Sequence, residues 1–256
     1  MLVKSIVASL LALASAAAAS AQTIVYVNQA NTSATQNGRS WATAYTEIQT
    51  GIEAARESFG GEVWVAAGTY GEDRDNAGAL RLRSGVNVYG GFVGDEAARG
   101  QRDPVANPTT IDASTSAGGE PADSAVLGAT NAVLDGFTVR GGAGQDGAGM
   151  TNISVSPTVV NCTFTENNAT RFGGAVLNVG GATPVFRNCV FLKNHAGDSG
   201  GAIANTGAVP SVQNCQFLQN DAVNVGGDVF LSSSLFDGNT AGNGGGAIFN
   251  EKASPS

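Results

Sequence analysis

Apolar and polar residues recur in a repeating pattern through the C-terminal half of the chain. The first three copies contain Asn-Cys-x-Phe-x-x-Asn, and a pair of glycines follows several residues later. The phenylalanines of successive copies are 27, 26 and 19 residues apart, and the glycine pairs keep the same spacings. Two markers that shift together define a structural period, which predicts a solenoid whose units bury their apolar faces by stacking. The phenylalanines are Phe164, Phe191, Phe217 and Phe236, and the glycine pairs begin at Gly173, Gly200, Gly226 and Gly245.

Within each copy, apolar residues occupy every second position, which is the period of a β-strand. When the copies are aligned, equivalent residues form columns. The Cys column and the Phe column lie two residues apart and are expected to face inward. The column between them, Thr163, Val190 and Gln216, is expected to face out. A second strand follows each glycine pair, with one apolar column inward and both flanking columns outward. A third strand follows Pro157, Pro184 and Pro210. The sequence therefore predicts an all-β, right-handed parallel β-helix with three short strands per coil. The second inward column is Met150, Val176, Ile203, Val229 and Ile248.

Asparagine recurs at the predicted corners, where like residues of stacked coils would lie about 4.8 Å apart. Amides at that spacing hydrogen-bond along the axis, so two asparagine ladders are expected. The fourth copy, with 19 residues, is expected to lack the proline-associated strand and to have Ser234 in the Cys column. A fifth Gly-Gly-Ala-Ile-Phe-Asn, at 245–250, begins another turn. The ladders are Asn161, Asn188 and Asn214, and Asn167, Asn194, Asn220 and Asn239.

The N-terminal half lacks the repeat. Strands are predicted at 24–27, 62–66 and 85–89, and a helix at 44–58 has Ile48, Ile52 and Ala55 on the face that would close the solenoid. The expected organisation has four parts. They are a signal peptide (1–21), an N-terminal cap with the first irregular coils (22–125), repetitive coils (126–250) and a short polar tail (251–256).

The first 21 residues have the features of a secretory signal peptide. Lys4 precedes an apolar run at 6–13, and Ala19-Ser20-Ala21 is a small-x-small cleavage pattern. We therefore expect a protein that is secreted or attached to the outer membrane or cell surface, without an integral membrane segment. The formal net charge of −8 disfavours nucleic-acid binding.

The three cysteines, Cys162, Cys189 and Cys215, belong to one stacked column. Export favours disulfides, but parallel Cβ vectors in neighbouring coils do not point at each other. Buried free thiols are therefore favoured over a bridge.

Two short motifs resemble catalytic sequences. Gly197-Asp-Ser-Gly-Gly201 contains the serine-protease nucleophile pattern at Ser199, but it aligns with Phe172 and Val225 at an ordinary corner, and the single histidine, His195, lies in the same loop. Gly142-x-Gly144-x-x-Gly147 matches the dinucleotide fingerprint, but no helix is expected after it. Both motifs are interpreted as structural, and His195 as a surface loop residue.

Several segments of the N-terminal half stand out: Tyr26-Val-Asn, Gly38-Arg-Ser-Trp-Ala-Thr-Ala-Tyr45, Val63-Trp-Val-Ala-Ala-Gly-Thr-Tyr70, Val88-Tyr-Gly-Gly-Phe92 and Gln101-Arg-Asp103. These segments resemble secreted bacterial right-handed β-helix proteins of the pectin-lyase-like superfamily. The Gly-Gly-Ala-Ile and Phe-x-x-Asn repeats also resemble those of polymorphic outer membrane proteins, which are surface adhesins and autotransporters. The resemblance covers residues 24–250 and implies the β-helix fold, whereas activity varies among such proteins.

An exported structural or binding protein, adhesin-like and not enzymatic, is the favoured function. The alternative is a polysaccharide lyase with a lateral groove, whose base would be an Arg or Lys near calcium-binding carboxylates. Only a chance alignment, such as Arg187 with Asp228, would supply such a site. No catalytic, cofactor-binding or metal-ligating residue is therefore predicted, and no cofactor. The expected partners are a polysaccharide or a host or cell-surface ligand, together with end-to-end self-association. The expected binding face comprises the outward strand columns and the corner loops near 169–172, 195–199 and 221–225.

Overall fold

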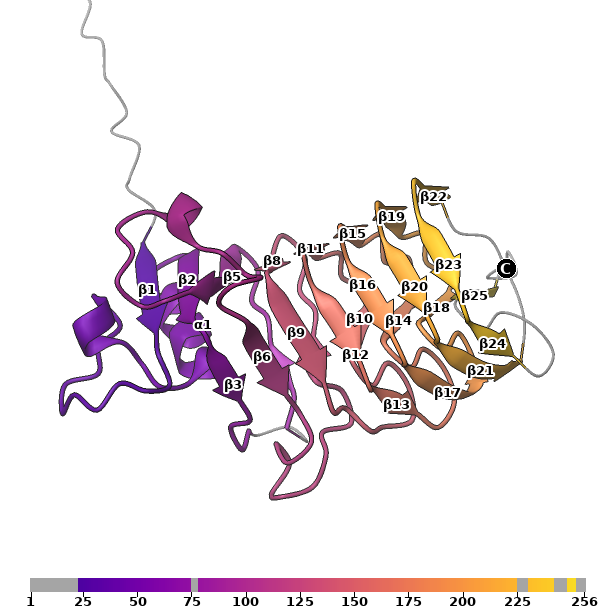
Figure 1. Cartoon of the computed structure of the whole chain (residues 1–256), viewed down its shortest axis with the longest axis horizontal. Coiled ribbons are helices and arrows are strands. Elements are labelled where there is room, and N and C mark those ends of the chain that lie inside the picture. The colour runs from indigo at the N-terminus through magenta and orange to yellow at the C-terminus, as the bar shows by residue number, and fades with distance from the viewer. Residues whose placement is uncertain (1–22, 75–77, 225–229, 242–247, 252–256) are drawn as a thin grey trace, which may run out of the picture.

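The computed structural model describes residues 23–74, 78–224, 230–241 and 248–251. Parallel strands stack coil upon coil along one long axis, and a helix covers the N-terminal end (Figure 1). The predicted all-β parallel β-helix is therefore confirmed. None of the helices in the described ranges is both long enough and apolar enough to cross a membrane.

Sheet A, the longest, begins with the N-terminal strand and runs through the cap and the repeats without a break. Its neighbouring strands are all parallel, so the irregular and repetitive parts share one continuous sheet. In order, its strands are β1 (Ile24–Val27), β2 (Gly61–Ala66), β5 (Val86–Phe92), β8 (Val133–Asp135), β11 (Thr158–Val160), β15 (Val185–Arg187), β19 (Ser211–Gln213) and β22 (Phe230–Ser232).

Sheet B follows sheet A after a tight turn, except between β5 (Val86–Phe92) and β6 (Thr109–Asp112), where a longer loop intervenes. Its strands are β3 (Gly68–Tyr70), β6 (Thr109–Asp112), β9 (Phe137–Arg140), β12 (Thr163–Thr165), β16 (Val190–Leu192), β20 (Gln216–Leu218) and β23 (Leu235–Asp237). Sheet C comprises β4 (Leu80–Arg81), β7 (Val126–Leu127), β10 (Met150–Ile153), β14 (Val176–Val179), β18 (Ile203–Thr206) and β25 (Ile248–Glu251).

A fourth, smaller sheet, sheet D, was not predicted. It lies at the corner after sheet B and contains residues 195–199 and 221–224, which belong to the segments 195–199 and 221–225 that the sequence suggested were loops. These residues form strands, because their backbones pair in parallel from coil to coil. Its strands are β13 (Asn168–Ala169), β17 (His195–Ser199), β21 (Asp221–Asn224) and β24 (Thr240–Ala241).

Helix α1 (Ile48–Glu57) closes the N-terminal end as predicted. Ile48, Ile52 and Ala55 are fully buried against the first strands of sheet A. Gly51 permits this close approach, since a Cβ there would lie 2.5 Å from a methyl group of Val27. Two short 3-10 helices, η1 (Trp41–Thr43) and η2 (Arg99–Gln101), complete the elements.

The interior confirms the predicted Phe column. Phe164, Phe191 and Phe217 are fully buried, and successive rings stack with centroids 5.4 and 4.8 Å apart. Cys162, Cys189 and Cys215 are free and buried beside them, as expected. Burial raises the pKa of the Cys162 thiol to about 12, so this thiol stays protonated.

The predicted ladder from Asn167 to Asn239 is present, and of the other predicted ladder the Asn161–Asn188 bond is present; the two differ in exposure. Asn167, Asn194 and Asn220 are buried, and each amide donates to the next asparagine at 2.9–3.0 Å. Asn161 and Asn188 are exposed and have positive φ angles of 52° and 53°. A third, buried ladder that the sequence did not indicate joins the amides of Asn152, Asn178 and Asn205 inside sheet C.

The columns beside Met150, Val176 and Ile203 were predicted to point outward, but several of their residues are buried and not exposed to solvent. Ala175, Ala202 and Ala204 are fully buried. The corner glycines Gly173 and Gly200, with φ of 65° and 69°, turn the preceding loop back over sheet C. The loop therefore covers a strand face that would otherwise meet solvent.

The prediction for the short fourth coil is also wrong in one respect. Strand β22 pairs with β19, so the proline-associated strand of sheet A is retained, and β18 pairs directly with β25. Among the described residues, therefore, no strand of sheet C lies between β18 and β25. The predicted Val229 lies outside the described residues. Ser234 does occupy the Cys column, where its hydroxyl accepts the Cys215 backbone N–H at 3.4 Å.

Candidate functional site

An inserted loop at 93–108, between β5 and β6, lies over the outer face of sheet A. The buried carboxylate of Glu96 shapes it by accepting backbone N–H groups of Val93, Gly94 and Asp95 at 2.6–3.2 Å. Burial alone would raise the pKa of this carboxyl, but the backbone hydrogen bonds outweigh burial and hold the pKa below its ordinary value. Glu96 therefore fixes the loop as a carboxylate.

An aromatic cluster fixes the base of the loop. Trp64 and Phe92 stack with centroids 4.8 Å apart on the outer side of sheet A, and Tyr26 and Trp41 pack against them. The indole N–H of Trp41 donates to the backbone carbonyl of Glu96 at 3.0 Å. The loop is thus tied to a rigid platform formed by strands that are distant in sequence.

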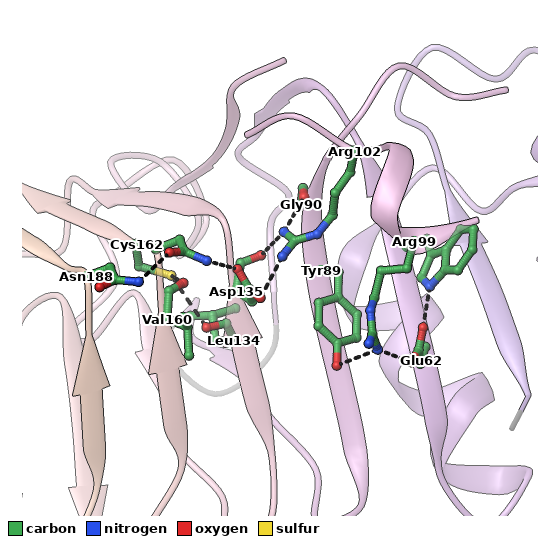
Figure 2. Close-up of polar contacts among 12 residues, drawn as sticks. Glu62, Tyr89, Gly90, Arg99, Arg102, Leu134, Asp135, Val160, Cys162 and Asn188 are labelled. Atoms are coloured by element: carbon green, nitrogen blue, oxygen red, sulfur yellow. Dashed lines mark hydrogen bonds and ion pairs between the residues drawn. The ribbon is translucent and has the colours of Figure 1, made fainter. Parts of the chain in front are cut away.

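Two arginines of the loop reach down to sheet A (Figure 2). Arg99 pairs with Glu62, contacts the Tyr89 hydroxyl at 3.1 Å and lies 4.6 Å from the centre of that ring. Arg102 pairs with Asp135 at 2.6 Å and donates to the Gly90 carbonyl at 3.0 Å. The Arg99 side chain is 47% exposed whereas that of Arg102 is 14% exposed. Arg99 can therefore donate to a ligand, while Arg102 mainly positions the loop.

Asp135 joins the loop to the exposed asparagine ladder. Its second carboxylate oxygen accepts the Asn161 amide at 2.9 Å, and the Asn161 oxygen accepts the Asn188 amide at 3.2 Å. A directional polar row thus runs from Asn188 through Asn161 and Asp135 to Arg102 (Figure 2). Because each amide donates in the same direction, the row presents ordered amide edges to solvent at the turn between sheets A and B.

These elements enclose an open depression of about 590 Å³, which we call the arginine groove. One wall is the inserted loop, including Pro104 and the 93% exposed Val105. The opposite side is the outer face of sheet B, which contributes Thr138 and Thr163. The groove combines a guanidinium, amides, hydroxyls and an apolar wall. Its lining is Arg99, Gly100, Arg102, Pro104, Val105, Pro108, Thr109, Gly136, Phe137, Thr138, Asn161, Thr163 and Asn188.

The charges around the arginine groove are balanced. Arg99 and Arg102 each face one carboxylate, Glu62 and Asp135 respectively. Burial raises the pKa of Tyr89 and is only partly opposed by the nearby Arg99, so the phenol remains neutral. The site therefore offers directional hydrogen bonds with almost no net charge.

A second depression lies between α1 and sheet C. Its polar groups hold the helix in place: Glu53 pairs with Arg83 at 2.6 Å, the Gln49 amide bonds the backbone of Arg81, and Glu72 accepts the Ile48 N–H at 2.8 Å. We therefore assign it to fold stability. A third, acidic depression at its border is lined by Glu47, Glu72, Asp73 and Asp112, among others. Across the described ranges, no group of three or more His, Cys, Asp and Glu side chains is arranged to hold a metal ion.

The protease-like motif has no triad geometry. The Ser199 hydroxyl donates to Asp198 at 3.1 Å, whereas His195 contacts Asp221 of the next coil at 2.8 Å. Ser199 pairs with Phe172 and, after a bulge, with Asn224, one residue before the predicted Val225. The structural interpretation of this corner therefore agrees with the contacts observed.

The other sequence candidates also occupy structural positions. Strand β10 follows Gly142–Gly147, so the dinucleotide pattern is not followed by a helix. Arg187 bonds Gln213 at 3.1 Å, and Asp228, its chance partner, lies outside the described residues. The expected corner loops do not line the arginine groove.

Sequence reasoning did not identify Arg99, Arg102 or Asp135 as site residues. They occur once each, so no repeat marks them, and only the path of the inserted loop brings them together. One signal was present: Arg102 and Tyr89 belong to the segments at 101–103 and 88–92 that carried the family resemblance.

The parallel sheets and the lateral groove define the class of this molecule, a parallel β-helix protein. The family described as "Protein of unknown function (DUF1565)" matches residues 31–247, so the chain belongs to this family. No curated protein matches the sequence. A structure of the pectin methylesterase from Aspergillus niger in deglycosylated form is similar, with 13% identity, a TM-score of 0.39, and 91% of each chain covered. The penultimately deglycosylated form of that enzyme gives the same identity and TM-score, covering 91% of this chain and 86% of the other.

Proposed function

We propose that this protein is an exported, adhesin-like binding module that holds a carbohydrate in the arginine groove and does not cleave it. The observation that carries the proposal is the composition of that groove. Donors and acceptors at fixed positions suit sugar hydroxyls, and Pro104 and Val105 offer an apolar wall to the C–H face of a sugar ring. The loop and the strands hold these groups before any ligand arrives, which lowers the entropy cost of binding.

The same composition favours binding over catalysis. None of the described residues that line the groove is an aspartate, glutamate or histidine, the side chains that most often act as general acids or bases. The two arginines are cations held by carboxylates, and an arginine has no acceptor for a proton. A lyase mechanism would need one of them as a free base.

Export is part of the proposal and rests on the sequence. Residues 1–21 have the charge, apolar run and cleavage pattern of a signal peptide. A secreted or surface location gives a carbohydrate-binding module access to extracellular or cell-surface polysaccharides. Mass spectrometry of the protein recovered from a secreting host would test this part, since mature chains should begin at Gln22.

A glycan array followed by calorimetry tests the binding function. Arg99→Gln and Asn161→Gly should each weaken binding at least about tenfold, a loss of about 1.4 kcal/mol. Glycine at 161 tolerates the positive φ of that turn, so only the amide is removed. Arg171→Gln is the matched control, because Arg171, like Arg99, is an exposed arginine paired with a carboxylate, here that of Asp146, but lies away from the groove.

Two results would contradict the proposal. One is the absence of binding to any saccharide. The other is the release of shortened or unsaturated sugars during incubation, with or without calcium, which would favour the lyase alternative.

A further inference from the structure

A row of threonines follows the axis on the outer face of sheet B. The register of successive strands places Thr69 beside Thr110, Thr110 beside Thr138, and Thr138 beside Thr163. Thr69 is exposed and the other three are half-buried. No hydrogen bond among the described residues uses these four hydroxyls. We call these residues the threonine row.

The arginine groove opens onto this row. Thr138 and Thr163 line the groove, while Thr110 and Thr69 continue toward the N-terminal cap beyond it. Paired parallel strands are about 4.8 Å apart, so each coil offers one hydroxyl at a regular interval. A ligand that enters the groove can therefore extend along the axis and meet the same group repeatedly.

The charges of the described residues along this face include no surplus cation. Beside the threonine row, Arg140 pairs with Asp112 at 2.6 Å, as the two arginines of the groove pair with their carboxylates. Thr69, at the N-terminal end of the row, also lines the acidic depression, which adds the carboxylates of Glu47 and Asp73. The chain as a whole has a formal net charge of −8, which repels a polyanion at long range.

We infer that the ligand of the arginine groove is a linear, neutral polysaccharide that lies along the β-helix axis over the threonine row. The inference rests on the proposed carbohydrate-binding function and adds the class of ligand and its direction. A linear chain of like units suits a surface that repeats at a fixed interval, as extended solenoid surfaces do. A compact or branched ligand would engage the groove alone. A uronate polymer would place many carboxylates on a surface with no surplus cation.

The test compares the length and the charge of the ligand. Calorimetry would use neutral β-1,4-linked disaccharides and hexasaccharides and oligogalacturonates of the same lengths, at low and high salt. The neutral hexasaccharide should bind at least about tenfold more tightly than the disaccharide, and salt should leave its affinity unchanged within about twofold, since screening acts on charges.

A substitution outside the arginine groove distinguishes the contribution of the threonine row to binding from that of the groove. Thr110→Val keeps the shape and the strand propensity but removes a hydroxyl, so it should weaken the hexasaccharide about threefold to tenfold and leave the disaccharide unchanged. Thr158→Val, a half-buried threonine on the outer face of sheet A, is the control.

The outcomes separate this inference from the function on which it rests. Equal affinities for both lengths would overturn the inference. So would a preference for oligogalacturonates that weakens with salt, or no effect of Thr110→Val. In each of these cases, loss of binding in Arg99→Gln would leave the proposed function standing. If no saccharide binds at all, both are wrong.

Discussion

The N-terminal region, to about residue 125, and the repetitive coils after it share three continuous sheets but use their outer faces differently. In the repeats, the outer sides of sheets A and B carry mainly polar or aliphatic side chains, most of them half-buried, and no inserted loop covers them in the described residues. In the N-terminal region, an inserted loop, four packed aromatic rings and paired arginines cover sheet A. The repeat therefore supplies a regular scaffold with amides and hydroxyls at fixed intervals, and features that occur once add the charged and aromatic groups.

Polar groups are also satisfied differently in the two regions. The repeats use neutral amide ladders, which extend from coil to coil because each coil provides the same residue. The N-terminal region uses ion pairs between residues far apart in sequence, such as Arg99 with Glu62. A ladder forms wherever neighbouring coils provide the same residue, whereas an ion pair forms only where the path of the chain brings two particular residues together. Substitutions in the two regions should therefore have different consequences.

The largest expected effect is in the interior of the repeats. Phe191→Ala removes the middle ring of the Phe164–Phe191–Phe217 stack and should lower the free energy of unfolding by about 3–5 kcal/mol. Denaturant unfolding followed by circular dichroism measures it. Saccharide affinity of the folded fraction should stay unchanged, because the ring does not reach the arginine groove. Unchanged stability would contradict the inward direction of this column.

Next in size is a comparison of the two asparagine ladders. Asn194→Ala leaves the Phe164 carbonyl and the Asn220 amide oxygen without this donor inside the protein, and should cost about 2–3 kcal/mol. Asn188→Gly removes an exposed amide from a turn with positive φ, and water replaces it, so the cost should stay below about 1 kcal/mol. Chemical unfolding of both variants checks the difference. Equal losses of unfolding free energy in the two variants would show that burial does not determine how much each ladder contributes to stability.

Because of the repeat, much of the structure of the C-terminal half could be predicted from the sequence. The Phe, Cys and Asn columns were predictable because stacked coils place identical residues together, so alignment of the copies substitutes for spatial information. The flanks of sheet C were not predictable, since Gly173 and Gly200 turn a loop back over them through positive φ angles that the alignment does not reveal. The site was not predictable because Arg99, Arg102 and Asp135 belong to no repeat, and their contacts depend on the path of one loop.

A smaller effect is expected in the inserted loop, and it depends on pH. The folded pKa of Glu96 lies below its ordinary value of 4.5, so its carboxylate contributes stability above about that pH, and this contribution is lost as the pH falls through the lowered pKa. Glu96→Gln should be less stable than the unsubstituted protein by about 1–2 kcal/mol at neutral pH.

The difference in the free energy of unfolding between Glu96→Gln and the unsubstituted protein should shrink as the pH falls. Unfolding measured at several pH values from neutral to about 3 checks this, and saccharide binding should weaken in Glu96→Gln because the loop forms one wall of the groove. A difference that is constant with pH would show that the charge of Glu96 is not the cause.

The smallest effect is expected at the motif that most resembles a catalytic sequence. Ser199 is buried, its hydroxyl bonds the neighbouring Asp198, and its backbone pairs with Phe172 and Asn224 in the adjacent coils. Neither of those residues is a serine, so the corner does not require a hydroxyl to form. Ser199→Ala should therefore change the free energy of unfolding by less than about 1 kcal/mol and leave saccharide affinity unchanged. Peptidase and esterase assays should give the same rates for both proteins. A hydrolytic rate that disappears in Ser199→Ala while circular dichroism stays unchanged would show that the repetitive region, and not only the N-terminal insertions, carries chemistry.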